Sequence, residues 1–282
     1  MNDKSGEEEV FRASPILLVP VAASLVVSVL CASLILMSGT DFLSVTLFSD
    51  VGFGPFINAT IFVALTGIGA SMIYLLLRRK RLWVIRVLIC FAVTVVTFFL
   101  SDFYLWMLFS LLNVADVELL AFLNAVLVTV IVDVEFFVLD NVGYEIIVLT
   151  LGGALGTFLG ASIPTFSAVF ILLFLGIYDI FAVTRGPVGK IALEGLRHLR
   201  GLSFSFRDIQ MGLGDVTFYS MLISHAFIFF GPWACLSSTI GVLAGSLISF
   251  KMLEKKSIFP GLPFSVFLGL LGVFLVVALQ YF

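Results

Sequence analysis

Two stretches in the second half of the chain decide its class: VFILLFLGIYDIFAV (Val169–Val183) and MGLGDVTFYSMLI (Met211–Ile223). Each is apolar enough for the interior of a membrane, and each carries one aspartate, Asp179 in the first and Asp215 in the second. A carboxylate at membrane depth costs about 3 kcal/mol or more, so it marks a functional site and is expected to have a partner. We therefore predict that the two aspartates are each other's partner.

The composition places the whole chain in a membrane. The 282 residues are 61% hydrophobic and 12% charged, whereas a soluble domain is roughly half apolar and a quarter charged. The net charge of −3 argues against nucleic acid as a partner. The three cysteines, Cys31, Cys90 and Cys235, are scattered in apolar runs and form neither a metal-binding spacing nor a disulfide framework. No cofactor is expected.

Apolar runs of about 20 residues repeat along the chain, which predicts an all-α polytopic membrane protein with a single integral-membrane domain over 1–282. The nine predicted spans are approximately 15–37, 56–77, 82–100, 117–139, 144–163, 164–184, 209–231, 233–250 and 261–280. The stretch Phe103–Leu112 either extends the third helix or lies at the membrane interface. The first apolar run is too long for the core of a signal peptide. The segment before it is acidic, whereas a signal peptide starts with positive charge, so we expect the run to be a retained helix.

The positive charges predict the orientation. With the N-terminus and the loop 185–208 in the cytoplasm, and the C-terminus outside, every Lys and Arg falls on the cytoplasmic side, as the positive-inside rule requires. These residues are Lys4, Arg12, Arg78, Arg79, Lys80, Arg81, Arg86, Arg185, Lys190, Arg197, Arg200, Arg207, Lys251, Lys255 and Lys256. A tenth span would invert the orientation of all later segments and so place their Lys and Arg residues outside. The protein is therefore expected in the cell membrane with nine spans.

Small residues predict close helix packing. Gly152, Gly156 and Gly160 recur every four residues in the fifth span, and Gly241 and Gly245 in the eighth. This spacing lets helix backbones approach closely in lipid.

The two aspartates are predicted at similar depth. Asp179 lies six residues before Arg185, and Asp215 lies eight residues after Arg207. On continuous helices both would be roughly 9–12 Å inside the cytoplasmic boundary. Two carboxylates held close share a proton, so one can act as a general base toward water while the other acts as a general acid. This chemistry is peptide hydrolysis without a metal or a covalent nucleophile.

Neighbouring residues fit such a site. Gly212 and Gly214 allow close approach or local unwinding beside Asp215, and Tyr178 beside Asp179 could donate a hydrogen bond. Pro260-Gly261-Leu262-Pro263 opens the last span, where the prolines either expose backbone groups or mark a helix start. The sequence does not favour a zinc protease or a serine hydrolase, because it has neither His-Glu-x-x-His nor Gly-x-Ser-x-Gly.

Three motifs in order, Tyr178-Asp179, Gly212-Leu213-Gly214-Asp215 and Pro260-Gly261-Leu262-Pro263, resemble those of the presenilin and signal peptide peptidase family, the GxGD intramembrane aspartyl proteases. The resemblance covers nearly the whole chain. It implies a presenilin-like fold, Asp179 and Asp215 as the catalytic pair, and the other motif residues as groups that shape the site and receive the substrate.

Details of the resemblance point to one branch. Animal presenilins have alanine where this chain has Gly261, and the glycine form resembles archaeal presenilin homologues. The long cleavable loop of animal presenilins is absent, which argues against activation by self-cleavage. The cytoplasmic loop 185–208 has presenilin polarity, opposite to that of signal peptide peptidases. The implied partners are transmembrane helical peptides and the lipid bilayer, without obligate partner subunits; a homo-oligomer stays open.

The sequence leaves two alternatives. A preflagellin or prepilin peptidase is also a GxGD aspartyl enzyme, but it resembles a smaller bundle that cuts at the membrane surface. A transporter or cation leak channel could use the same aspartates as a proton or cation site. For an intramembrane aspartyl protease, the function we favour, the expected substrates are single-span membrane proteins or residual signal peptides.

Overall fold

The computed structural model describes residues 13–39, 44–137, 142–184, 203–206, 209–254 and 259–281. In this part of the chain nine helices are long and apolar enough to cross a membrane. The elements are η1 (Pro15–Leu18), α1 (Val19–Ser38), α2 (Gly54–Arg78), α3 (Leu82–Leu111), α4 (Val117–Phe137), α5 (Val142–Ser162), α6 (Thr165–Thr184), β1 (Ser203–Phe206), β2 (Ile209–Gly212), α8 (Leu213–Phe230), α9 (Pro232–Leu253) and α10 (Leu262–Tyr281). The predicted all-α membrane fold is confirmed.

Two predicted boundaries change. The stretch Phe103–Leu112 continues α3 as far as Leu111, so this helix has 30 residues and is about 45 Å long. It exceeds a hydrocarbon core of about 30 Å and has to tilt. The seventh span was predicted to begin at 209, but Ile209–Gly212 is a strand and the helix begins at Leu213. Most of the predicted loop 185–208 lies outside the described residues.

The strand replaces a helical turn because the local sequence is rich in glycine. Gly212 has extended backbone angles (φ −72°, ψ 142°), and glycine loses more conformational freedom in a helix than other residues do. Strand β2 pairs with β1 in an antiparallel hairpin, with Phe206 opposite Ile209 and Ser203 opposite Gly212. The estimate that Asp215 lies eight residues inside a continuous helix is therefore wrong: it is the third residue of α8.

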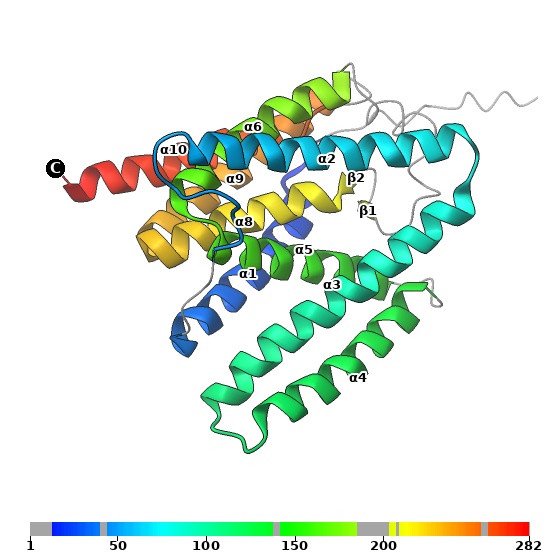
Figure 1. Cartoon of the computed structure of the whole chain (residues 1–282). Coiled ribbons are helices and arrows are strands. Elements are labelled where there is room, and N and C mark those ends of the chain that lie inside the picture. Colours follow the sequence, from blue (N-terminus) through cyan, green and yellow to red (C-terminus); the bar gives the residue numbers. More distant parts are fainter. Residues whose placement is uncertain are drawn as a thin grey trace, which may run out of the picture.

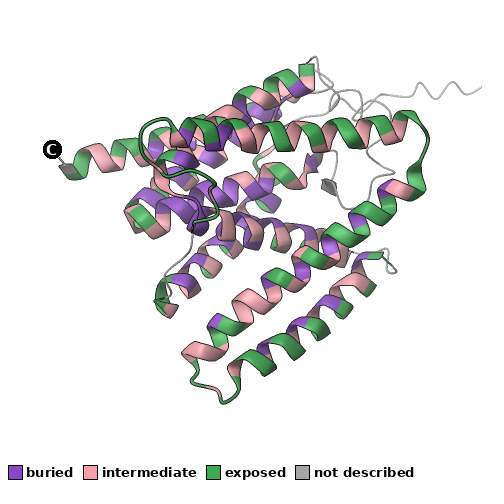
Figure 2. Ribbon diagram, in the orientation of Figure 1, coloured by how far each residue is buried: buried purple, intermediate pink, exposed green. Residues whose placement is uncertain are grey.

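The helices surround α5 and α8 (Figure 1), which pack against each other along their length. Helix α1 lies against both, α6, α9 and α10 form one side of the bundle, and the α3–α4 hairpin forms the opposite edge. Figure 2 shows burial concentrated in the central helices, and ten of the 18 residues of α8 are buried. Helices α2, α3 and α4 instead expose many large apolar side chains, as surfaces against lipid do.

The close contact of α5 and α8 depends on the glycine spacing noted in the sequence. A methyl group built on Gly156 would lie 2.6 Å from the Cβ of Ser220, and one on Gly160 would lie 2.6 Å from the carbonyl oxygen of Met221. Neither position has room for a side chain. The predicted role of these glycines in packing is confirmed, and it holds the helix that carries Asp215 in place.

The start of α6 is held by a loop residue. Asp50 accepts hydrogen bonds from the backbone N–H groups of Phe166 (2.9 Å) and Ser167 (2.8 Å) and from the Ser167 hydroxyl (2.7 Å). It thus satisfies N–H groups of the first helical turn that have no partner within the helix. Asn58 of α2 donates to the Ser167 hydroxyl oxygen (3.0 Å). These contacts anchor the helix that carries Asp179.

Candidate active site

Helices α6, α8 and the start of α10 meet where the two aspartates lie. Asp179 is one turn before the end of α6, and Asp215 is in the first turn of α8. Both are partly buried. The chain runs in opposite directions along α6 and α8, so the end of one helix and the start of the other lie at the same side of the bundle.

Both carboxylates contact one short backbone segment. The N–H of Leu262 donates to Asp179 Oδ2 at 3.1 Å. A methyl group built on Gly261 would lie 3.0 Å from Asp215 Oδ2 and 3.5 Å from Asp215 Cγ. The two side chains therefore reach the Gly261–Leu262 segment together.

Three hydroxyl groups hold the Gly261–Leu262 segment through the carbonyl oxygen of Gly261. The carbonyl oxygen of Gly261 accepts hydrogen bonds from Tyr219 (2.9 Å), Ser265 (3.3 Å) and Ser249 (3.4 Å). Tyr219 and Ser265 are almost fully buried, and the hydroxyl of Ser265 also pairs with that of Ser246 at 3.0 Å. The backbone that touches both aspartates is thus fixed in position.

The sequence analysis missed these hydroxyl residues. Tyr219 follows Asp215 by four residues, so both lie on one face of α8. That spacing could have indicated that Tyr219 lies near the site. Ser249 and Ser265 carried no comparable signal, because a serine in a membrane helix most often bonds within its own helix.

The other predicted site residues lie around the pair with different contacts. The Tyr178 ring lies 3.5 Å, and its hydroxyl oxygen 3.6 Å, from a methyl group built on Gly67 of α2. A methyl group on Gly212 would be 3.8 Å from Asp215 Oδ2, and one on Gly214 would meet only the Phe218 ring at 3.9 Å.

Two apolar cavities adjoin the site. One, of about 730 Å³, lies between α6 and α10 and is lined by Gly176, Ile180, Pro260 and Pro263, among others. The other, of about 330 Å³, lies between α2, α3 and α5 and reaches Leu213, two residues before Asp215. A peptide could therefore approach the pair through apolar surroundings from either side.

Neither a metal site nor a catalytic histidine accompanies the pair within the described residues. Among the described residues, no group of three or more His, Cys, Asp or Glu side chains could hold a metal ion. His225 of α8 bonds the carbonyl of Gly160 (2.8 Å) and the hydroxyl of Thr165 (3.2 Å), so it links helices.

Comparison with known proteins agrees with the fold. Two crystal forms of a presenilin family intramembrane aspartate protease superpose with TM-scores of 0.65 and 0.63, both at 19% sequence identity, covering 93% of this chain and 99% or 96% of the solved chains. Presenilin-B of Dictyostelium discoideum is 34% identical over 126 residues, which are 40% of this chain. The chain spans about a quarter (26%) of the length of that relative. No family model matches. The chain thus has a presenilin-like fold, and the expected resemblance to presenilins is confirmed.

Proposed function

We propose that the protein is an intramembrane aspartyl endopeptidase that hydrolyses peptide bonds within transmembrane segments of single-span membrane proteins or residual signal peptides. One observation carries the proposal: two carboxylates from separate membrane helices meet at the Gly261–Leu262 backbone. A carboxylate within a membrane helix is costly, so two that meet at one segment support a functional site. The likeness to a presenilin family protease supports the same function.

The chemistry needs only the two carboxylates and water. One carboxylate takes a proton from water, and the water oxygen attacks the carbonyl carbon of the substrate peptide. The other carboxyl group, protonated, gives its proton to the amide nitrogen as the C–N bond breaks. The products are a new carboxylate and a new amine, so the pair returns to its shared-proton state after the protons redistribute.

A helical substrate must unwind before its amide can be attacked, and the hairpin offers a place for the extended chain. Each strand of the two-stranded β1–β2 sheet has one edge that is unpaired within the described residues. Strand β2 leads directly into Leu213 and Asp215. A peptide that adds to this edge would gain backbone hydrogen bonds and would lie beside the pair.

The proposed orientation keeps the N-terminus and loop 185–208 in the cytoplasm and the C-terminus outside. The charge distribution of the sequence supports it. The backbone N–H of Ala13 donates to Glu254 at the end of α9, so the start of the first span and the end of the eighth lie on one side, which fits eight crossings between them in either orientation. A reporter fused within the loop, near residue 195, tests it: an external signal would contradict the proposal.

The function is tested with purified protein in detergent and a single-span reporter substrate. Wild type is expected to cleave, and Asp179→Ala and Asp215→Ala are expected to lose cleavage by more than 100-fold. A transition-state inhibitor of aspartic proteases should block the wild type. Asp133→Asn is the matched control, because Asp133 is a carboxylate of a membrane helix (α4) whose hydrogen bond comes from Thr94 of α3, away from the pair.

Other outcomes separate the alternatives. Cleavage that survives both alanine variants would refute the aspartyl mechanism. Cleavage mapped several residues outside the hydrophobic span of the substrate would favour a prepilin-type peptidase. Ion flux in proteoliposomes that Asp215→Asn abolishes, without proteolysis, would favour a transporter. Activity of the purified single chain would support the expectation that no partner subunit is obligate.

A further inference from the structure

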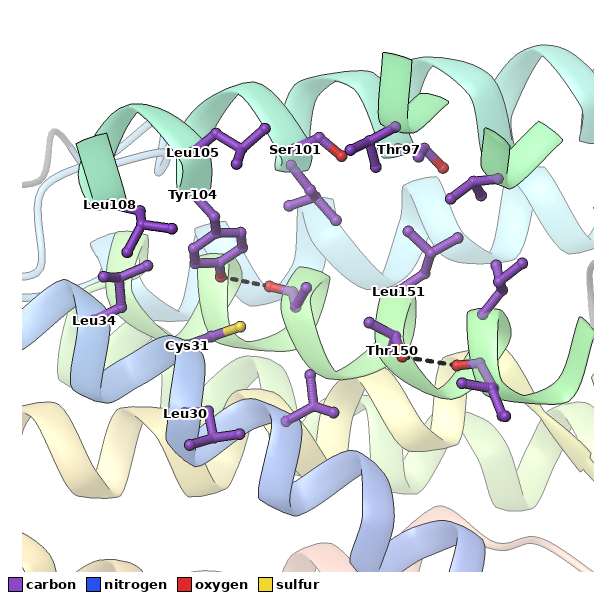
Figure 3. Close-up of a pocket in the computed structure, with 17 residues that line it drawn as sticks. Leu30, Cys31, Leu34, Thr97, Ser101, Tyr104, Leu105, Leu108, Thr150 and Leu151 are labelled. Atoms are coloured by element: carbon purple, nitrogen blue, oxygen red, sulfur yellow. Dashed lines mark hydrogen bonds between the residues drawn. The ribbon is translucent and has the colours of Figure 1, made fainter. Parts of the chain in front are cut away.

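A third cavity lies away from the aspartates, between α1, α3, α4 and α5, and has a volume of about 470 Å³. Figure 3 shows it, with Leu30 and Leu34 of α1 on one wall and Tyr104 and Leu108 of α3 on another. We call it the peripheral cavity. It shares no residue with the cavity between α6 and α10, and it shares only Leu151 with the cavity between α2, α3 and α5.

The peripheral cavity runs from a lipid-facing rim to a buried floor. At the rim, Leu30 is 65% exposed and Ile146 is 60% exposed. At the floor, Leu100 is 2% exposed and Ala154 is 8% exposed. Because these helices span the membrane, the medium at the rim is hydrocarbon, so a hydrocarbon ligand can enter from the bilayer without crossing water.

The dimensions fit one extended hydrocarbon chain. Thr97 and Leu108 mark the two ends of the cavity along α3 and are eleven residues apart, which is about 16 Å of helix. The 470 Å³ is the space open to the centre of a water-sized sphere, so dividing it by this length gives roughly 30 Å² for the path of that centre and, with the diameter of the sphere added, a clear width of about 9 Å. A helix with its side chains is about 10 Å wide, so a transmembrane peptide is too wide for the slot.

We propose that the peripheral cavity binds one acyl chain of a membrane phospholipid. The chain would complete the packing of the α3–α4 hairpin, because α4 packs along α3 but touches α5 only weakly (Figure 1). Without an occupant, the lining side chains would face empty space and lose their dispersion contacts. The lipid thus acts as a packing element between the hairpin and the central helices, separate from the site of hydrolysis.

The side chain of Thr97 allows an experiment to distinguish an acyl chain from a polar ligand. Thr97, only 1% exposed, lines the cavity (Figure 3), and its buried hydroxyl oxygen has no hydrogen-bond partner among the described residues. A ligand with a carbonyl or hydroxyl group at this depth would bond to it, whereas an acyl chain would not. Replacing Thr97 by the isosteric valine should therefore leave acyl-chain binding unchanged or strengthen it.

The test uses the full chain in nanodiscs of phosphatidylcholine that carries a diazirine in the middle of one acyl chain. After illumination, adducts are mapped by mass spectrometry. We expect adducts on the buried residues Leu100 and Ala154, which bulk lipid cannot reach. Filling the cavity with Ala154→Phe should lower the yield on Leu100 by fivefold or more. Ala64→Phe, at an exposed position of α2, adds the same ring outside the cavity and should have no effect.

The outcomes decide the proposal. Adducts confined to exposed positions in the wild type would overturn it. A several-fold fall in labelling with Thr97→Val would overturn the acyl chain in favour of a ligand that bonds the hydroxyl. Should Ala154→Phe fail to fold, Ser101→Leu fills the same cavity. As a second measurement, added phospholipid should raise the Tm of the wild type in detergent and raise that of the filled variant by less than half as much; equal rises would count against the site.

Discussion

Replacing Gly261 by alanine tests how closely the backbone of α10 approaches the aspartates. The new methyl group would lie 3.0 Å from Asp215 Oδ2 and 3.5 Å from the Tyr219 hydroxyl oxygen. The first contact is tighter than ordinary van der Waals separation, so the carboxylate has to move by a few tenths of an ångström. The second is ordinary contact and requires no movement.

The size of the effect follows from this displacement. Because a misplacement of about 1 Å can cost about 100-fold in rate, a shift of a few tenths should lower kcat by roughly 3- to 10-fold. The free energy of unfolding should change by less than about 1 kcal/mol, since the lower entropy of the unfolded alanine chain offsets part of the crowding.

The assay compares kcat on the single-span reporter with the unfolding midpoint of the same preparations. Gly261→Val adds two more methyl groups and should reduce kcat further than Gly261→Ala, again with the larger loss in rate than in stability. Wild-type kcat in both variants would refute the argument that this Cα faces Asp215. Unfolding of the alanine variant would show instead that Gly261 serves the fold alone.

Three further predictions concern the supports of the site. Asp50→Ala removes the acceptor at the start of α6 and should cost about 1–2 kcal/mol in unfolding free energy, with Asp50→Asn costing less; equal losses would contradict the capping role. Tyr219→Phe removes the 2.9 Å bond to Gly261 and should cost about 1 kcal/mol, read from chemical unfolding; no loss would contradict this bond. Gly156→Leu should separate α5 from α8 and destabilise by about 3 kcal/mol or more, whereas Gly69→Leu, where a Cβ meets nothing within 4 Å, should change the unfolding midpoint little.

Much of the fold could be predicted because the bilayer imposes simple rules. A span needs about 20 apolar residues, so the nine spans follow from the sequence. The glycine repeat of α5 indicated close packing because only a missing side chain permits it. The motifs around Asp179 and Asp215 indicated a site because an unused charge in a membrane is costly.

One boundary was predicted wrongly and another was left open by the sequence. Residues 209–212 are apolar enough to extend a helix, yet they pair with β1. Phe103–Leu112 was left open between helix and interface, and packing against α4 continues it as helix to Leu111. At 209–212 the strand pairs with a neighbouring segment of the same hairpin, which hydropathy alone does not indicate.

The sequence by itself therefore determined the membrane class, the number of spans and the two aspartates, because each depends on the cost of polar groups in lipid. Only the tertiary structure decided that Tyr219, Ser249 and Ser265 share the carbonyl of Gly261, that Asp50 holds the start of α6, and that a cavity separates the α3–α4 hairpin from α1 and α5. Most of these features join residues of different helices. Their positions depend on helix tilt and rotation, which packing sets and hydropathy does not.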